Sequence, residues 1–318
     1  MIRARGPSRR RIPRILDNLF HYVTALVAVG ILALLAAIIV VLFEASKLSL
    51  ARFGIGFIVG SRWDPTHQIF GALPFIYGTL LTSAIGLVIA VPISLFIAIF
   101  LSELAPGWLS APLGYVVELL AAVPSVVFGL WGIAVLVPFM AKTVEPSLAP
   151  LNSIVPIFSG AHNGIDVLTA GVILAIMIIP TISSISREAL RAVPSNQREA
   201  ALSLGATRWE ATRMSVLSYS RVGIVAAIIL GLGRAVGETM AVTMTIGNRD
   251  AIPTSLFSQG QSIASLIANE FFSAPPASLE VDSIIEAALV LLLITLVINV
   301  FAQVLVSRLL RGTGGRIE

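Results

Sequence analysis

The sequence of 318 residues contains no cysteine, which excludes disulfide bonds and thiolate metal sites. Charged side chains are also scarce, at 12% of the chain compared with about 25% in soluble domains. The histidines His21, His67 and His162 are scattered and lack the spacing of a metal site. No Gly-x-x-x-x-Gly-Lys-Ser/Thr sequence occurs, so the loop that cradles the phosphates of ATP is missing. We therefore expect this chain to bind no metal or other cofactor.

The chain does contain long apolar runs, and 57% of its residues are hydrophobic. Each run reaches the roughly 20 residues that a helix needs to cross a bilayer. Five runs contain no ionisable acid or base, and the sixth is interrupted only by Arg234 and Glu238. The runs are 22–43, 74–101, 119–141, 167–186, 222–246 and 287–306. They predict an all-α membrane protein with six transmembrane helices. The first run exceeds the apolar core of a signal peptide, about 7–15 residues, so we expect it to be retained.

The arginines lie in three groups, and six spans place all three groups on one side of the membrane. The groups are Arg3, Arg5, Arg9, Arg10, Arg11 and Arg14 before the first span, Arg187, Arg191, Arg198, Arg208, Arg213 and Arg221 between the fourth and fifth, and Arg308, Arg311 and Arg316 after the last. Basic residues concentrate on the cytoplasmic side of membrane proteins, so both termini are predicted to be cytoplasmic. This distribution argues against a nucleic-acid partner. The N-terminal group indicates topology and attraction to anionic lipid, with a dedicated binding role as the alternative.

The apolar runs divide the chain into membrane and water-exposed segments. We expect a basic cytoplasmic tail at 1–18, a first transmembrane helix at 19–46, a periplasmic loop at 47–72, a membrane domain at 73–311 and a cytoplasmic tail at 312–318. Within the membrane domain, an outer loop at 143–166 joins the third and fourth spans. Prolines lie inside three spans, at Pro92, Pro124, Pro138 and Pro180. They indicate kinked helices that serve packing, or alternatively kinks that shape a cavity.

The long cytoplasmic segment 187–221 is predicted to form two short helices with a tight corner between them. Ser195 can cap a helix that begins near residue 196, and Gly205 permits a sharp turn at its end. Thr207 and Glu210 have the spacing of a capping box for a second helix. A flat alanine face beside a glycine corner is typical of a helix that inserts into a groove on another protein.

A motif in this segment is shared with a known family. Glu199-Ala200-Ala201, three residues and then Gly205 resembles the EAA loop of ABC importer permeases. The family pattern continues nine residues later with Ile-x-Leu-Pro, and of the corresponding residues here only Leu217 agrees. The resemblance implies that Glu199, Ala200, Ala201 and Gly205 belong to a coupling helix that lies in a cleft of an ATP-hydrolysing subunit.

The fifth span carries two charges, Arg234 and Glu238, near its middle. A charge at the centre of a bilayer costs roughly 2.5–3.5 kcal/mol, so we do not expect these side chains to face lipid. Because they are four residues apart, we expect them to share one helix face, on which they can approach each other. Arg before Glu is the weaker order for such a pair, so a loose pairing, or one shared with another helix, is the alternative. One interpretation is a static ion pair between helices. The other is a transport site, because a guanidinium fork matches the oxygens of phosphate or carboxylate. Gly233 and Gly237 also share a face and suggest a close helix contact.

Longer stretches strengthen the resemblance. The relevant sequences are Trp63-Asp64-Pro65, 70–79 (FGALPFIYGT), 118–125 (ELLAAVPS) and 233–242 (GRAVGETMAV). They resemble the PstC-type permease of high-affinity phosphate importers, from about Trp63 to the C-terminus. The resemblance implies a type I importer permease core, of the kind called MetI-like, with an added N-terminal helix. It also implies that Arg234 and Glu238 are the charged pair needed for phosphate passage. Taken alone, Glu118 indicates a snorkelling or helix-packing acid more than a functional carboxylate.

The resemblance also implies the partners and the setting. They are a second homologous permease, two ATP-binding cassette ATPases that use the ATP, an extracytoplasmic phosphate-binding protein and the bacterial inner membrane. The chain is expected to be a transport subunit and not an enzyme. Two alternatives stay open at this point. One is an ion-coupled secondary transporter or channel for another oxyanion, and the other is a structural membrane subunit without a transport path.

Overall fold

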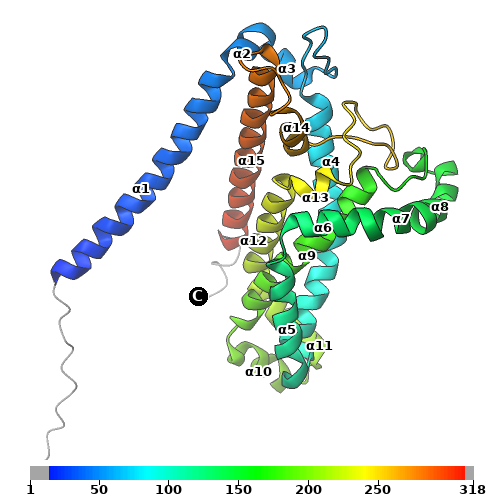
Figure 1. Ribbon diagram of the computed structural model, residues 1–318. Helices are drawn as coiled ribbons and strands as arrows, with labels where there is room; N and C mark the ends of the chain where they lie inside the picture. Colours follow the sequence, from blue (N-terminus) through cyan, green and yellow to red (C-terminus); the bar gives the residue numbers. More distant parts are fainter. Residues whose placement is uncertain (1–13, 312–318) are drawn as a thin grey trace, which may run out of the picture.

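The computed structural model describes residues 14–311, which fold almost entirely into helices (Figure 1). Among these residues, extended backbone pairs only at two isolated bridges, between Asp64 and Ile69 and between Gly247 and Gly260. Most of the predicted N-terminal tail and the tail at 312–318 lie outside the described residues. The arginines outside are Arg3, Arg5, Arg9, Arg10, Arg11 and Arg316.

The helices vary in length from one turn to more than 30 residues. In chain order, the α-helices are α1 (Arg14–Ala45), α2 (Lys47–Phe53), α3 (Gly56–Val59), α4 (Leu73–Ile99), α5 (Gly107–Ala121), α6 (Ser125–Trp131), α7 (Val137–Phe139), α8 (Glu145–Leu148), α9 (Val167–Arg191), α10 (Ser195–Ser203), α11 (Arg208–Ala211), α12 (Leu217–Val236), α13 (Met240–Thr243), α14 (Ile263–Glu270) and α15 (Leu279–Arg311). Single π-helical turns at Phe100–Leu104, Gly132–Leu136, Met140–Val144 and Thr212–Val216 extend or join several of them, and 3-10 turns at Ala149–Ser153 and Pro156–Phe158 follow α8.

Six helical segments within residues 14–311 are long and apolar enough to cross a membrane, which confirms the number predicted. The central helix is α9, which packs against α4, α5 and α12. In its most apolar stretch 67% of the residues are buried, compared with 0% in α1. Small residues permit this packing, because a Cβ at Gly171 would meet Ile85 of α4 at 2.4 Å. The outermost helix, α1, leans away from the bundle and meets α15 and α2 near their upper ends in Figure 1.

Two predicted spans are interrupted. The third apolar run is divided at 122–124, because Pro124 disfavours helical geometry at the preceding residue, and α5 ends at Ala121. The helical path then continues beyond the predicted end of the span to Leu148, so the predicted outer loop at 143–166 is partly helical. The fifth run is also not one helix, because α12 ends at Val236 and α13 begins at Met240.

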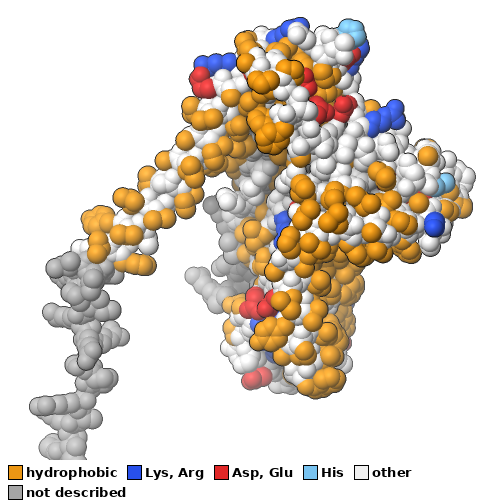
Figure 2. All heavy atoms as spheres, in the orientation of Figure 1, with side chains coloured by type: hydrophobic (Ala, Val, Ile, Leu, Met, Phe, Trp, Pro, Cys, Tyr) orange, Lys and Arg blue, Asp and Glu red, His pale blue; other side chains and the backbone are white. Residues whose placement is uncertain are grey.

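The distribution of side chains agrees with a membrane protein. Hydrophobic side chains cover α1, the flanks of the bundle and the arm formed by α6 to α8, whereas charged side chains gather mainly at the upper and lower ends (Figure 2). Helices α10 and α11 lie at the lower end in Figure 1, and segment 187–221, to which they belong, contains six arginines. The N-terminal end of α1 and the C-terminal end of α15 point toward the same side (Figure 1).

At the opposite end lies an aromatic cluster that contacts a titratable side chain, Glu270. Trp63 contacts Phe70 and Phe75 edge to face, and its Nε1 donates a hydrogen bond of 2.9 Å to Oε2 of Glu270. Burial is the main cause that raises the pKa of Glu270 to about 7, from an ordinary value of 4.5. The neighbouring Asp250 and, more weakly, Glu280 add to this effect, and the hydrogen bond from Trp63 opposes it.

This shift has a testable consequence for stability. A carboxyl group whose pKa is higher in the folded protein stabilises the fold fully below pH 4.5, and this contribution is lost as the pH rises through 7. We expect the melting temperature of the detergent-purified protein to decline over this window. Glu270→Gln retains a hydrogen-bond acceptor for Trp63 and should flatten the decline. Thermal unfolding at a series of pH values measures both proteins, and an equal slope in the variant would contradict the assignment.

Candidate functional site

The intramembrane charges lie on either side of the break between α12 and α13. Arg234 is in the last turn of α12, where a positive charge interacts favourably with the helix dipole. Its Nη1 donates a hydrogen bond of 3.0 Å to Oγ1 of Thr181 on α9. Among residues 14–311, its side chain makes no other hydrogen bond or ion pair. One guanidinium nitrogen is thus fixed, and the rest of the fork is available to a ligand.

Glu238 lies beyond Gly237, two residues before α13 begins at Met240. Its Oε1 accepts a hydrogen bond of 3.2 Å from the backbone N–H of Ala241, in the first turn of that helix. A carboxylate at a helix N-terminus is stabilised by the exposed N–H groups and by the dipole. Both charges are half-buried; Arg234 lies in the last turn of α12, and Glu238 accepts from the first turn of α13.

The prediction that Arg234 and Glu238 share one helix face is wrong, because the helix ends between them. No ion pair within 4.0 Å joins the two side chains, both of which are described. The predicted close contact through Gly233 and Gly237 is also absent. A Cβ at Gly233 would meet nothing within 4 Å, and both glycines line an open groove of about 380 Å³ beside α1 and α15.

The segment 187–221 has the predicted corner. Gly205 adopts a φ of +86°, which L side chains rarely occupy, and it follows the end of α10. Its N–H donates to the carbonyl of Leu202, and the N–H of Ala206 donates to that of Ala201. These two bonds form a Schellman motif, which satisfies the last carbonyls of the helix. Glycine is therefore required here by the backbone and not by crowding, because a Cβ would meet nothing within 4 Å.

The beginnings of the two short helices differ. The predicted capping box is confirmed, because Thr207 accepts from the N–H of Glu210 at 3.3 Å and the Glu210 carboxylate accepts from the N–H of Thr207 at 2.8 Å. The predicted cap at Ser195 is wrong. Ser195 is already the first residue of α10, and Pro194 occupies the cap position without a side-chain hydrogen bond.

A groove of about 460 Å³ runs along the corner. It is lined by Gln197, Ala200, Ala201, Leu204, Gly205, Ala206, Glu210, Met214 and Ser215. Three of the four residues predicted to couple to a partner therefore share one concave surface. The fourth, Glu199, is exposed on the same helix but does not line the groove. Leu204 is 89% exposed, so the corner presents an apolar side chain to the surroundings.

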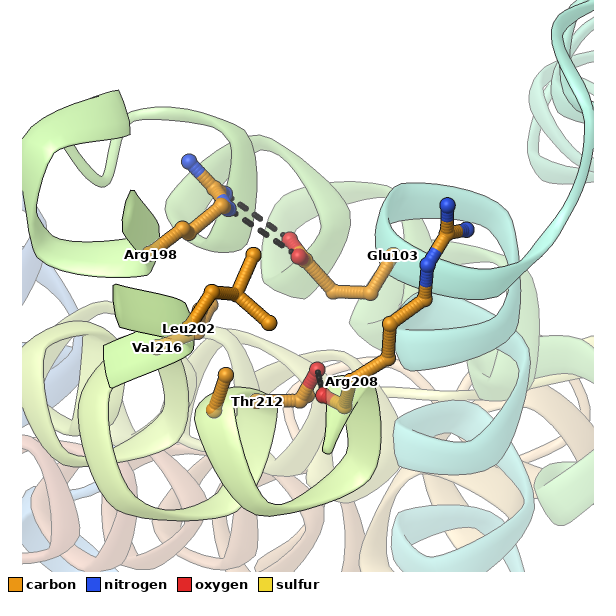
Figure 3. Close-up of a pocket in the computed structure, with 7 residues that line it drawn as sticks. Glu103, Arg198, Leu202, Arg208, Thr212 and Val216 are labelled. Atoms are coloured by element: carbon orange, nitrogen blue, oxygen red, sulfur yellow. Dashed lines mark hydrogen bonds and ion pairs between the residues drawn. The ribbon is translucent and has the colours of Figure 1, made fainter. Parts of the chain in front are cut away.

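On its other side, α10 is held by an ion pair that the sequence did not indicate. Arg198 and Glu103 point toward each other across a cavity of about 190 Å³, with Leu202 and Val216 also in its wall (Figure 3). Nη2 of Arg198 donates to Oε1 of Glu103 at 2.8 Å, and Nε donates to Oε2 at 3.0 Å. This pairing raises the pKa of Arg198. The signal available in the sequence was a lone acid in the short segment between the second and third spans.

The intramembrane charges and the α10 corner lie at different levels of the bundle. The former are near α13 in the middle of the molecule, and α10 is at its lower end (Figure 1). Glu118 belongs to neither site. Its Oε1 lies 3.5 Å from Nη1 of Arg187, a buried arginine on α9 that packs against Gly114. This contact agrees with the interpretation of Glu118 as a helix-packing acid.

Curated proteins similar to this chain agree over almost its whole length. The phosphate transport system permease protein PstC of Haemophilus influenzae is 43% identical over 303 residues, which cover 94% of this chain and 96% of that protein. The PstC protein of Mesorhizobium japonicum is 44% identical and covers 94% of this chain and 92% of its own length. PstC 1 of Mycobacterium tuberculosis is 39% identical, covering 81% of this chain and 83% of its own length.

A solved structure shows the same fold. A chain of the MetNI methionine ABC transporter, in an inward-facing conformation, superposes with a TM-score of 0.57 at 16% identity. The superposition covers 78% of this chain and 99% of that chain, and it confirms the predicted MetI-like core with α1 in addition. The family model described as binding-protein-dependent transport system inner membrane component matches residues 90–313. The chain therefore belongs to this family of binding-protein-dependent permeases and, within it, to the PstC-type phosphate transport permeases.

Proposed function

We propose that this chain is the membrane-spanning permease subunit of an ATP-driven, high-affinity importer of inorganic phosphate, and that it forms half of the translocation pathway. The observation that carries the proposal is the 43% identity, over 94% of the chain, to a protein named for phosphate transport. The geometry of the intramembrane charges supports it. A partly unoccupied guanidinium within an apolar bundle suits an oxyanion that passes through the membrane.

In this proposal Arg234 and Glu238 are the translocation residues. The phosphate oxygens take the free N–H groups of Arg234, and Thr181 keeps the guanidinium oriented toward the path. Glu238 keeps the empty path close to neutral. Because the two side chains are not paired directly, phosphate does not have to break an ion pair in order to bind.

The chain acts with separate partners and binds no cofactor of its own. A second, homologous permease completes the pathway, two ATP-binding cassette subunits hydrolyse ATP, and an extracytoplasmic protein delivers phosphate. The permease domain spans 73–311. Support for external ATP hydrolysis comes from the missing phosphate-binding loop and from the groove beside Gly205, a concave surface that a partner can enter.

The proposed setting is the bacterial inner membrane, with several spans and with both termini in the cytoplasm. The charge distribution supports this orientation, because the arginine-rich segment 187–221 should face the cytoplasm. Transport then proceeds by alternating access. ATP binding closes the two ATPase subunits, which displaces Glu199, Ala200, Ala201 and Gly205 of the coupling segment, and α9, α4 and α12 reorient around the path.

The test is a complete complex reconstituted into liposomes with the binding protein. We expect ATP hydrolysis to be stimulated by phosphate-loaded binding protein and labelled phosphate to accumulate only when ATP is present. Complexes with a catalytically inactive ATPase serve as the control and should accumulate none. Phosphate uptake that persists without ATP and follows an imposed proton or sodium gradient would contradict the proposal.

A further inference from the structure

One arginine spans the corner between the coupling helix and the helix before it. Only three residues, 192–194, connect α9 to α10, and Pro194 is extended, with a ψ of 140°. Such a connection has no continuous helical hydrogen bonds and can act as a hinge. A hinge at this place would let α10 rotate without moving α9.

The guanidinium of Arg198 restrains this hinge, because it binds both the end of α9 and the connecting residues. Its Nη2 donates a hydrogen bond of 2.9 Å to the carbonyl of Leu190, in the last turn of α9. Its Nη1 donates a hydrogen bond of 2.6 Å to the carbonyl of Val193, within the hinge. The last carbonyls of a helix have no partner inside the helix, so they are good acceptors for a positive charge. One side chain of α10 thus binds α9 and the connecting residues at once.

The same guanidinium also joins α10 to α4, which is distant in sequence. Glu103 lies in the π-helical turn that ends α4, and its side chain is only 9% exposed. Its two oxygens accept from Nε and Nη2 of Arg198, a planar pairing that fixes direction as well as distance. Lysine has one point charge and cannot make this set of contacts.

From this corner a series of contacts leads to the translocation residues. On α4, Ser94 donates to the carbonyl of Ile179 at 3.2 Å, which ties α4 to α9 within the bundle. Two residues later, Thr181 accepts the hydrogen bond from Arg234. A displacement of α10 that moves α9 as a rigid body therefore reaches the side chain that holds Arg234.

We propose that Arg198 is a positioning residue, and that its ion pair with Glu103, here called the brace, makes α10, α9 and α4 move as one unit. Movement of the ATPase is thereby transmitted to the pathway. This inference rests on the proposed function, because it assumes that α10 receives the movement. Without the brace, the hinge at 192–194 absorbs the displacement. ATP is then hydrolysed with little transport, although the complex stays assembled.

The first test is the ratio of ATP hydrolysed to phosphate transported by the reconstituted complex. In Glu103→Gln, which keeps the shape and removes the charge, we expect this ratio to rise about fivefold or more, the lower end of typical coupling free energies. Arg198→Lys should raise it as well, because the carbonyl contacts are lost. Glu188→Gln makes the same change at an exposed acid on α9 and should retain the wild-type ratio. Wild-type ratios in both brace variants would overturn the proposal.

The second test does not depend on phosphate. Because the chain has no cysteine, spin labels can be attached at Asn196→Cys on α10 and Phe96→Cys on α4, both exposed positions. In the full complex, the distance distribution should be narrow with wild-type Glu103 and broad in Glu103→Gln. An unchanged width would overturn the brace. A broadened width together with no phosphate-stimulated ATP hydrolysis in the wild type would support the brace and contradict the proposed function.

Discussion

Replacing Arg234 with glutamine is expected to abolish phosphate uptake while the complex still assembles. In the proposed function the guanidinium supplies charge-assisted hydrogen bonds to the passing anion, and a neutral amide cannot replace them. Losing about 3 kcal/mol of such interaction corresponds to an effect on the order of 100-fold. The loss of transport is measured as uptake of labelled phosphate by reconstituted complexes. Assembly is checked by co-purification of the partner subunits.

The matched control is Arg62→Gln, which makes the same chemical change at an exposed arginine that pairs with Asp64 in the segment between α3 and α4. It should transport like the wild type. Thr181→Ala removes only the hydrogen bond that orients the guanidinium, so its effect should be smaller than that of Arg234→Gln. Normal uptake in Arg234→Gln would remove this arginine from the transport mechanism.

Replacing Gly205 with valine should weaken binding of the ATPase more than tenfold and reduce uptake in parallel. A β-branched residue at a φ of +86° is strained by about 1–3 kcal/mol, so the Schellman motif opens and the corner loses its shape. The measurement is the amount of ATPase that co-purifies with the permease, together with phosphate uptake by the reconstituted complex.

Asparagine at the same position provides the conservative comparison. It tolerates left-handed geometry, and nothing in this chain lies within 4 Å of the added Cβ. Gly205→Asn should therefore retain most of the ATPase binding that Gly205→Val loses. If the valine variant binds the ATPase and transports phosphate normally, the corner is not the docking surface.

The sequence predicted the spans because an uncharged run of about 20 residues has few alternatives to a membrane helix. It could not predict where two of them break. Pro92 and Pro180 lie inside the continuous helices α4 and α9, whereas Pro124 separates α5 from α6. The same residue type gives both results, because neighbouring helices decide whether the freed backbone groups are satisfied.

The two candidate functional regions differ in how far local sequence determines their structure. The α10 corner follows from Gly205, Thr207 and Glu210, whose effects extend over only a few residues, and it was predicted correctly. The contact between Arg198 and Glu103 joins residues 95 positions apart, which no local pattern indicates. The sequence placed Arg234 and Glu238 in the same apolar run but did not indicate that the helix ends between them, because the helix end at Gly237 depends on packing in the bundle.

The interruption at Gly237 also affects the energy of the transport cycle. In a continuous helix, moving the carboxylate away from the guanidinium would require several backbone hydrogen bonds to break inside an apolar environment. Here the N–H groups of Gly237 and Glu238 still donate to the carbonyls of Gly233 and Ala235, but the regular helix ends at that point, and the Glu238 carboxylate accepts a hydrogen bond from the N–H of Ala241. In the proposed transport cycle the acidic and basic groups can therefore move with different neighbours, because α12 packs against α4, α9 and α15, whereas α13 packs against α6, α9 and α14.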